Sequence, residues 1–357
     1  MKGRVERLTD LLGDKEVDVL LVSDLVNVRY LTGFDGSSGV ALVGPRTRAF
    51  VTDFRYVEQA AEQVHASFAR VQASPDLLDA VIDLIPAGEV RLGFDDAHVP
   101  VRQHVRMREL LPERVELVAA GGLVERIRAV KDAEEVQRIR IAAQLADAAF
   151  ERIIRDGLVG RTEREVAIAL EHDMRTRGAR RPSFDSIVAA GPHGALPHAQ
   201  PRDVPIRPGE LVVIDWGAEL DGYCSDCTRT VAAGAPGDEA REVYELVLSA
   251  QLAGLKDVRA GRGGREVDAV ARDVIAARGH GEHFGHGLGH GVGMEVHEAP
   301  RLSQRSDDTL APGNVVTVEP GVYVPGRFGV RIEDLVLVTE NGSEVLNGLS
   351  KRLLTTD

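Results

Sequence analysis

The chain contains few of the residues that mark several classes of protein. It has only two cysteines among 357 residues, so we expect no disulfide framework of the kind that stabilises small secreted domains. These two, Cys224 and Cys227, have the C-x-x-C spacing of redox and zinc sites. One pair cannot complete a four-ligand zinc site, however, and positions i and i+3 of a strand face opposite sides. We therefore interpret both as packing residues.

Long apolar runs are also missing. No stretch of the sequence approaches the ~18 to 20 consecutive apolar residues that a membrane-spanning helix needs. The first residues carry charges at Lys2, Arg4 and Glu6, where a signal peptide needs an apolar core. These features predict a cytoplasmic protein that has no membrane partner.

Basic residues are outnumbered by acidic ones. The chain has 43 Lys and Arg against 56 Asp and Glu, a formal net charge of -13 at pH 7. Nucleic-acid binding requires clustered Lys and Arg that displace counterions, so we expect no DNA or RNA partner. The remaining composition, 43% hydrophobic and 28% charged, is ordinary for a globular enzyme. At this length, two domains are the natural expectation.

The first ~120 residues alternate helix-like and strand-like patterns, as a small α/β domain does. The predicted helices and strands lie at 5–12, 17–22, 40–43, 49–52, 77–84, 91–94, 102–111 and 115–118. A charge-rich segment at 125–131 follows Gly121–Gly122. We place the domain boundary there, which gives domains 1–124 and 125–357.

The second domain has a different pattern, in which a pair of helices is followed by strands, twice. Asp132 can cap a long helix to about Asp156, and Thr162 with Glu165 forms a capping box for the next one. The remaining predicted elements are strands at 210–218 and 222–232, helices at 238–260 and 265–278, and strands at 315–319 and 330–338. This order predicts an α+β fold with helices covering a mixed antiparallel sheet.

A hairpin signal lies between two aspartates. Asp221–Gly222 is a strong two-residue type I′ turn signal, which pairs Leu220 with Tyr223. In that register Asp215 faces Thr228. The register therefore follows from the turn alone.

This register places Asp215 and Asp226 on one face, because side chains alternate with period two, about 7 to 8 Å apart at the backbone. Gly217, opposite Asp226, leaves space there. A lone aspartate on a strand is usually solvated, but Asp215 directly follows the apolar run 211–214, which is typical of a strand buried on both faces. A carboxylate that enters a core needs compensation, and a metal ion supplies it.

Histidines and two glutamates extend this set. Five of the eleven histidines fall between residues 280 and 297, where flanking glycines allow close approach of backbone and substrate. Such a loop can also be a simple turn, but its density of imidazoles favours a functional role. Glu319 ends the apolar segment 315–318, and Glu333 lies within 330–335. Each alone is an ordinary glutamate, but four carboxylates and one imidazole together suit Mn²⁺ or Co²⁺ better than structural Zn²⁺, which is not excluded.

These residues resemble the M24 metallopeptidase family, which includes Xaa-Pro aminopeptidase, Xaa-Pro dipeptidase (prolidase) and methionine aminopeptidase and has the pita-bread fold. The motifs are two Asp eleven residues apart, an H-G-x-x-H segment, a Glu before Pro-Gly and an R-x-E segment, together with residues 27–34 and 295–298. The resemblance covers nearly the whole chain. It implies two bound ions, held by Asp215, Asp226, His290, Glu319 and Glu333.

The resemblance also implies a domain organisation. The N-terminal domain would be creatinase-like, a domain that plain methionine aminopeptidases lack, and this favours the proline-specific branch. The C-terminal domain would be a pita-bread catalytic domain with a pseudo-twofold repeat. A homodimer is implied, with Tyr30 near the partner's active site, although Tyr30 reads equally well as a core aromatic at the end of a strand.

For activity, the resemblance implies hydrolysis of the peptide bond before proline in a di- or oligopeptide. Two divalent ions, best matched by Mn²⁺, would lower the pKa of a shared water, and Glu319 would accept its proton. His198 and His297 would stabilise the tetrahedral oxyanion and the substrate. His286 would bind the proline portion or shuttle protons, and Arg331 would support the site.

Two alternatives remain on the same fold. A creatinase-like C-N hydrolase works without metal, and a non-catalytic binding protein lacks an intact site. Both require loss of the ligand set, whereas all five positions are filled here. Whether the enzyme is an aminopeptidase or a dipeptidase depends on loops that close the substrate pocket, and the sequence leaves this open.

Overall fold

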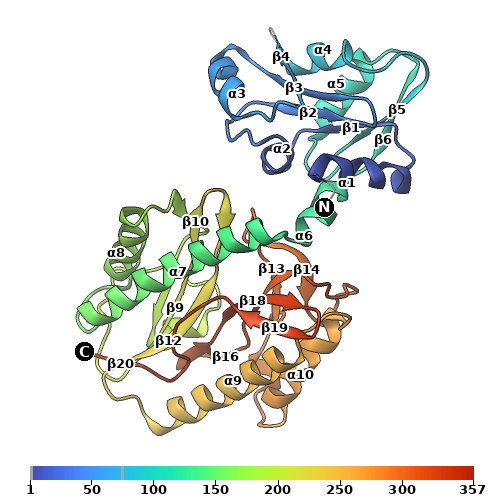
Figure 1. Cartoon of the computed structure of the whole chain (residues 1–357). Coiled ribbons are helices and arrows are strands. Elements are labelled where there is room, and N and C mark those ends of the chain that lie inside the picture. Colours follow the sequence, from blue (N-terminus) through green and yellow to red (C-terminus); the bar gives the residue numbers. More distant parts are fainter. Residues whose placement is uncertain (1–2, 74–75) are drawn as a thin grey trace. The chain divides into compact units, whose positions relative to one another are not determined.

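The protein, studied as a computed structural model that describes residues 3–73 and 76–357, divides into two compact units (Figure 1). One unit ends at Arg128 and the other begins at Ala129. The helix α6 (Leu123–Ala129) runs across the boundary proposed after residue 124, which stays a prediction. Within the described residues, no helix is long and apolar enough to cross a membrane.

The first unit is built on a six-stranded sheet of order β4-β3-β2-β1-β5-β6. The strands are β1 (Val19–Val22), β2 (Val40–Val43), β3 (Arg48–Thr52), β4 (Ala69–Gln72), β5 (Val90–Phe94) and β6 (Val115–Ala119). β1, β5 and β6 are parallel neighbours, so their carboxyl ends meet at one edge of the sheet. An apolar core that includes Leu42, Leu92 and Met107 packs against the strands.

The helices of this unit are α1 (Arg4–Leu11), α2 (Leu25–Thr32), α3 (Val57–Gln63), α4 (Leu77–Ile82) and α5 (Val101–Leu110). Tyr30 lies on α2, so the expectation of a strand end was wrong. The Asp24 carboxylate accepts a hydrogen bond from Asn27 N and caps this helix, and Gly33, with φ 87°, ends it. Tyr30 is buried, and Arg7 donates to its hydroxyl over 3.0 Å. Its approach to a partner's site stays a prediction.

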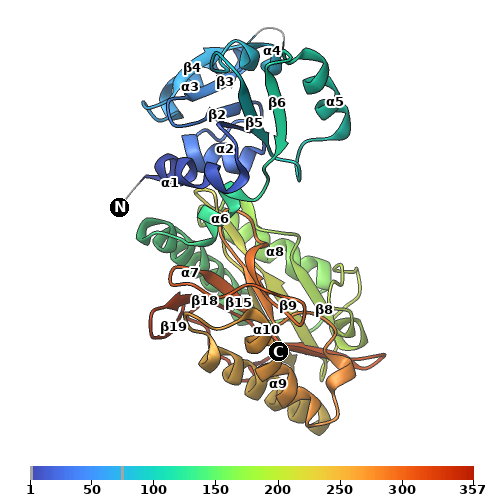
Figure 2. The same ribbon diagram turned by 90° about the vertical axis from the view of Figure 1, so that its right-hand side faces the viewer.

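The second unit contains the helix pairs α7 (Ala133–Asp156) with α8 (Glu163–Thr176), and α9 (Asp238–Asp257) with α10 (Gly264–Ala276). Figures 1 and 2 show these helices on the outside of the strands. Asp132 and Thr162 each form the predicted cap, and in both the glutamate three residues later returns a hydrogen bond. α7 and α8 begin at their predicted residues because these caps are local in sequence.

The strands of this unit form two main sheets, β20-β12-β9-β8 and β14-β13-β15-β18-β19. Their bounds are β8 (Ile187–Ala190), β9 (Leu211–Trp216), β12 (Cys227–Ala233), β13 (Gly289–Gly291), β14 (Glu298–Leu302), β15 (Val315–Val318), β18 (Asp334–Thr339), β19 (Gly342–Val345) and β20 (Thr355–Thr356). Smaller sheets contain β7 (Arg181–Pro182), β10 (Ala218–Leu220), β11 (Tyr223–Cys224), β16 (Gly321–Val324) and β17 (Phe328–Arg331).

The predicted repeat is present in the strand pairing. After α7 and α8, the strands β8, β9 and β12 pair antiparallel in that order; after α9 and α10, β13, β15 and β18 do the same. Each helix pair covers its own apolar core. In the first core the Phe150 and Trp216 rings stack at 4.4 Å, which anchors α7 to β9.

One predicted strand, 330–338, is two strands in the structure. Arg331 ends β17 opposite Gly321 of β16, whereas Asp334 begins β18 opposite Val318 of β15. The chain therefore changes sheets between these residues. Glu333 lies at the change, and its Oε2 accepts a hydrogen bond from Thr228 of β12 over 2.6 Å.

Candidate metal centre

The hairpin predicted from the sequence is present. Leu220 pairs with Tyr223, and Asp215 lies opposite Thr228. Both residues of the Asp221–Gly222 turn have positive φ, 50° and 84°, as a type I′ turn requires. The predicted register is therefore confirmed.

Gly217 interrupts the ladder between β9 and β10. A Cβ at this position would overlap the carbonyl oxygen of Ser225, so only glycine fits. The backbone of the facing strand thus occupies the space that a side chain would need. This close approach brings Asp226 toward Asp215.

The repeat places the carboxylates at matching points. Asp215 lies at the end of β9 and Glu319 directly follows β15, while Asp226 precedes β12 and Glu333 precedes β18. The pairs β9–β12 and β15–β18 are equivalent antiparallel pairs. Each half of the repeat therefore contributes two carboxylates.

All five predicted ligands lie together. Carboxylate oxygens of Asp215, Asp226 and Glu333 lie within 4.8 Å of one another. His290 Nε2 lies 3.6 Å from Asp226 Oδ2 and 3.3 Å from Glu319 Oε1. Their role as ligands remains a proposal, argued below.

The donor set fits divalent cations. Asp215 Oδ1 and Glu333 Oε1 are buried and have no hydrogen-bond partner in the described part of the chain. His290 Nδ1 donates to the carbonyl of Gly291 over 3.0 Å, which leaves the lone pair of Nε2 facing the carboxylates. Burial lowers the pKa of His290 to about 3, so the ring is neutral and can ligate a metal.

The carboxylates repel one another in a poorly solvated place. Burial, with the charge of Glu333 next, raises the pKa of Asp226 well above its ordinary value, and burial and Glu319 do the same for Glu333. Burial also raises the pKa of Glu319 to about 7. Arg331 compensates in part, because its Nη2 donates to Asp215 Oδ2 over 2.6 Å. Bound cations would neutralise the remaining charge.

Arg331 is held by a chain of hydrogen bonds that includes a residue missed from the sequence, Tyr323. Arg331 Nη1 donates to the Tyr323 hydroxyl over 2.7 Å, and this hydroxyl lies 2.8 Å from His286 Nε2. His286 Nδ1 donates to the Gly287 carbonyl, so Nε2 accepts from Tyr323. Burial lowers the pKa of His286 to about 4 and keeps it neutral. Both ring nitrogens are thus engaged, Nδ1 with the Gly287 carbonyl and Nε2 with the Tyr323 hydroxyl that contacts Arg331.

A cavity of about 620 Å³ opens onto the cluster, a size typical of small-molecule sites. His198 and His297 line it and are exposed, as a role at the substrate requires. The His297 ring meets that of His290 edge-on at 4.4 Å. Arg301 also lines the cavity and was missed from the sequence; its position three residues after Glu298, on the strand that pairs with His290, is the only signal.

The two C-x-x-C cysteines, Cys224 and Cys227, are free and buried. Cys224 Sγ donates to the carbonyl of Met294 and Cys227 Sγ to that of Glu333. Burial raises the pKa of Cys224 to about 12, so the thiol is not reactive at neutral pH. Both are packing residues, as predicted.

A cavity lined by four carboxylates and a neutral imidazole, on a twofold-repeated α+β unit, defines a metal-dependent hydrolase. Residues 137–340 match the model of metallopeptidase family M24, and residues 4–130 match the creatinase/prolidase N-terminal domain. The chain therefore belongs to metallopeptidase family M24. The predicted family and fold class, a creatinase-like domain followed by a pita-bread domain, are confirmed.

Solved structures and a curated relative match the whole chain. The Xaa-Pro dipeptidase from Bacillus anthracis is 42% identical with a TM-score of 0.95, covering 99% of both chains. The X-Pro aminopeptidase from Thermotoga maritima is 36% identical with a TM-score of 0.91, covering 99% of this chain and 100% of that one. The Xaa-Pro dipeptidase of Pyrococcus furiosus is 36% identical over 99% of this chain and 100% of its own length. Proteins of similar identity to this chain are thus named both Xaa-Pro dipeptidase and X-Pro aminopeptidase.

Proposed function

We propose that this enzyme hydrolyses the peptide bond before proline in Xaa-Pro dipeptides, with the help of two divalent ions. The observation that carries the proposal is the cluster of buried, mutually repelling carboxylates with two unpartnered oxygens. Mn²⁺ suits this oxygen-rich set, and Co²⁺ or Zn²⁺ also fits. The proposed ligands are Asp215, Asp226, His290, Glu319 and Glu333.

When bound, the two ions supply Lewis-acid chemistry, lowering the pKa of water and polarising the substrate carbonyl. Glu319 and Asp215 are the carboxylates most open to the cavity, with side chains 16% and 14% exposed. Asp215 is bonded to Arg331. Glu319 is therefore the residue placed to accept a proton from the attacking water.

The exposed imidazoles His198 and His297 can donate hydrogen bonds to the oxyanion that develops on the carbonyl and to the substrate. His286 has a different role from these two histidines, because both of its ring nitrogens are already hydrogen-bonded, to Gly287 and to Tyr323. We propose that it orients Tyr323, and through it Arg331, beside Asp215. In this way the cavity wall keeps Asp215 in place as substrate enters.

Arg301 supports the choice of a dipeptide. Arg301 lines the cavity, and among the described residues no carboxylate forms an ion pair with it, whereas Arg331 is bonded to Asp215. A dipeptide has a free carboxylate one residue beyond the cleaved bond, and a guanidinium binds such a group through paired hydrogen bonds. A longer peptide has no charge at that point.

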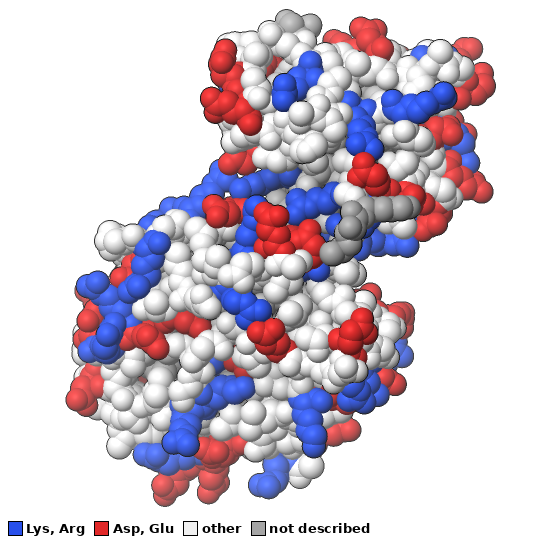
Figure 3. Space-filling view, viewed as in Figure 1, with Lys and Arg blue, Asp and Glu red and all other residues white. Residues whose placement is uncertain are grey.

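We also propose a cytoplasmic homodimer, from the family resemblance. The two free cysteines fit a reducing compartment. Acidic and basic side chains are interspersed on the face shown in Figure 3, where no continuous basic surface is visible. The absence of nucleic-acid partners stays a prediction.

Sedimentation equilibrium of the full chain tests the proposed homodimer, and a monomer at all concentrations would contradict it.

The first test compares substrates with the Mn²⁺-loaded enzyme. We expect cleavage of Ala-Pro with a kcat/KM at least about tenfold above that of Ala-Pro-Ala, since only the dipeptide presents a carboxylate to Arg301, and tenfold corresponds to about 1.4 kcal/mol. Ala-Ala is the control for proline, whose amide lacks an N-H. Preferential cleavage of Ala-Pro-Ala would instead indicate an aminopeptidase, and equal cleavage of Ala-Ala would contradict proline specificity.

The second test replaces Arg301 with glutamine. We expect KM for Ala-Pro to rise about 10- to 100-fold with little change in kcat, because a hydrogen bond to a charged group contributes about 1.5 to 3 kcal/mol. The kcat/KM for Ala-Pro amide, which has no carboxylate, should stay the same. Arg305→Gln, which changes an exposed residue outside the cavity lining, is the control. An equal loss on both substrates would rule out carboxylate binding by Arg301.

A further inference from the structure

The N-terminal unit contains a second group of acidic and imidazole side chains. It lies at the edge where the carboxyl ends of the parallel strands β1, β5 and β6 meet. Asp24 follows β1, Asp95 and His98 follow β5, and Glu125 follows β6 on α6. Loops at this edge of a parallel sheet converge, which is why ligands commonly bind there.

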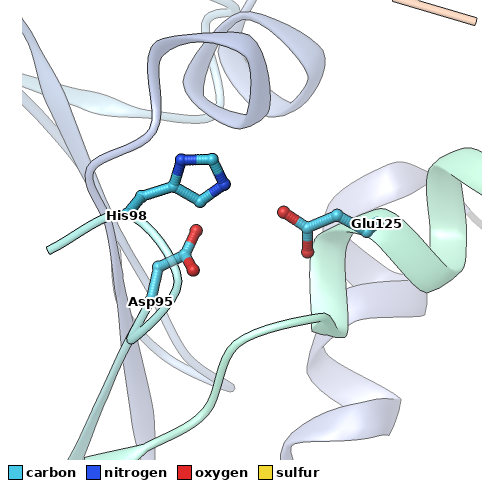
Figure 4. A group of neighbouring side chains, drawn as sticks. All are labelled: Asp95, His98 and Glu125. Carbon is cyan, nitrogen blue, oxygen red and sulfur yellow. The ribbon is translucent and has the colours of Figure 1, made fainter. Parts of the chain in front are cut away.

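Figure 4 shows that Asp95, His98 and Glu125 point toward a common space. Their ligand atoms all lie within 4.8 Å of one another. A carboxylate oxygen of Asp24 lies 3.8 Å from His98 Nδ1. Three carboxylates and one imidazole, from three separate segments of the chain, therefore meet in one place.

Asp95 is the buried member of this group. Asp95 is only 6% exposed, and Asp95 Oδ1 has no hydrogen-bond partner among the described residues. No Lys or Arg forms an ion pair with it in the described part of the chain. A buried carboxylate oxygen without a partner carries a substantial desolvation cost. Burial, with the charge of Glu125 next, raises the pKa of the Asp95 carboxyl.

Space for a ligand lies beside this oxygen. A Cβ on Gly121 would come within 3.3 Å of Asp95 Oδ1, so the glycine keeps the approach open. A cavity of about 10 Å³ lies against Asp95 and Glu125, lined also by residues 20–22 and 120–124 but not by His98 or Asp24. This is roughly the volume of one water-sized sphere. The space for a ligand is therefore defined by the converging ligand atoms of Asp95, His98 and Glu125, not by this cavity.

Neighbouring hydrogen bonds hold the Glu125 carboxylate in position. Asn27 Nδ2 donates to Glu125 Oε1 over 2.5 Å, and Arg128 Nη1 donates to Asn27 Oδ1 over 2.7 Å. The bond from Arg128 sets the orientation of the amide, so that its NH₂ group faces Glu125. Only one oxygen of Glu125 is engaged, and the other remains for a ligand. Such supporting bonds are typical of metal-ligating carboxylates.

We propose that Asp95, His98 and Glu125 bind one divalent transition-metal cation, with Asp24 as the adjoining carboxylate. Mixed carboxylate and imidazole ligands suit Zn²⁺ and Mn²⁺. The cation would satisfy Asp95 Oδ1 and link the loop after β5 to α6. It is separate from the catalytic ions, since all of its ligands belong to the N-terminal unit. The site would stabilise this unit rather than take part in hydrolysis.

The test measures the number of Zn²⁺ ions bound by the full-length chain, by equilibrium dialysis of metal-free protein followed by elemental analysis. Asp95→Asn should bind one ion per chain fewer than the wild type. Asp83→Asn, which removes an exposed carboxylate of the same unit, should bind the same number as the wild type. His98→Gln, at an exposed position, should also lose one ion and serves if Asp95→Asn is poorly folded.

The same comparison in an Asp226→Asn background separates this site from the catalytic centre. The difference of one ion between the chains with and without Asp95→Asn should persist there, whatever the catalytic centre binds. Crystals grown with Zn²⁺ should also show an anomalous peak between Asp95, His98 and Glu125. Equal stoichiometry of all N-terminal variants, or an ordered water in place of the peak, would overturn the proposal.

Discussion

Asp226→Asn is expected to lower kcat/KM for Ala-Pro by about 1000-fold or more while the fold is kept. The substitution preserves the shape of the side chain and removes one of the four carboxylate charges around the ions, whose Lewis-acid chemistry the reaction needs. A 1000-fold loss corresponds to about 4 kcal/mol of transition-state stabilisation. Steady-state kinetics with saturating Mn²⁺ and circular dichroism measure the two effects.

In the absence of metal, Asp226→Asn should not lower the stability of the protein, although it lowers the activity. In the metal-free wild type, Asp226 lies buried beside Glu333 and Asp215, which repel it. Removing its charge relieves this repulsion, so we expect the metal-free variant to have a Tm equal to or above that of the metal-free wild type. Added Mn²⁺ should raise the Tm of the wild type and raise that of the variant much less, because stabilisation by a ligand follows its affinity.

The control for this pair of measurements is Asp307→Asn, whose side chain is 93% exposed. It should leave both kcat/KM and the Mn²⁺-induced shift in Tm unchanged. An Asp226→Asn enzyme with normal turnover would contradict the metal-ligand assignment, and so would a variant with an undiminished Mn²⁺ shift.

Arg229→Met is expected to lower the free energy of unfolding by about 3 to 5 kcal/mol, the range found when one partner of a buried ion pair is removed. Arg229 and Asp334 are each 1% exposed, and Nη2 donates to Asp334 Oδ1 over 2.8 Å. Lys351 contacts the other oxygen of Asp334 over 2.7 Å, but it is partly exposed. Without Arg229, the buried Oδ1 of Asp334 loses the hydrogen bond from Nη2, and its charge keeps only the pairing with Lys351 at Oδ2. Urea unfolding of the metal-free proteins measures the change.

The same substitution should also affect the catalytic centre, because Arg229 Nη1 donates to the backbone carbonyl of Glu333. Arg265→Met is the matched control: it breaks an exposed ion pair with Asp307, worth less than about 1 kcal/mol. If Arg229→Met cost no more stability than Arg265→Met, the buried pair would not be a main support of the β12–β18 contact.

Predictability from sequence differs between local and distant features. The helices that begin at Ala133 and Glu163 are predicted closely because, in each capping box, the capping residue and its glutamate are only three residues apart. α2, by contrast, was missed, because its apolar pattern is short and strand-like, and only the Asp24 cap marks it. The break at residue 333 was also missed, since it depends on which distant strands pair with each side of it.

The sequence by itself determined the Asp215 and Asp226 pair, because a type I′ turn sets the register of its own hairpin and the alternation of side chains sets the shared face. The family motifs named the remaining ligands without placing them. Only the tertiary structure decided that His290, Glu319 and Glu333 meet this hairpin. It also decided that Arg301 lines the cavity, that Tyr323 contacts Arg331, and that Glu125 faces Asp95 and His98. Apart from the local pairs Asp95 with His98 and Tyr323 with Arg331, these contacts join segments that are distant in the sequence, and no local rule of turns or periodicity specifies how such segments pack.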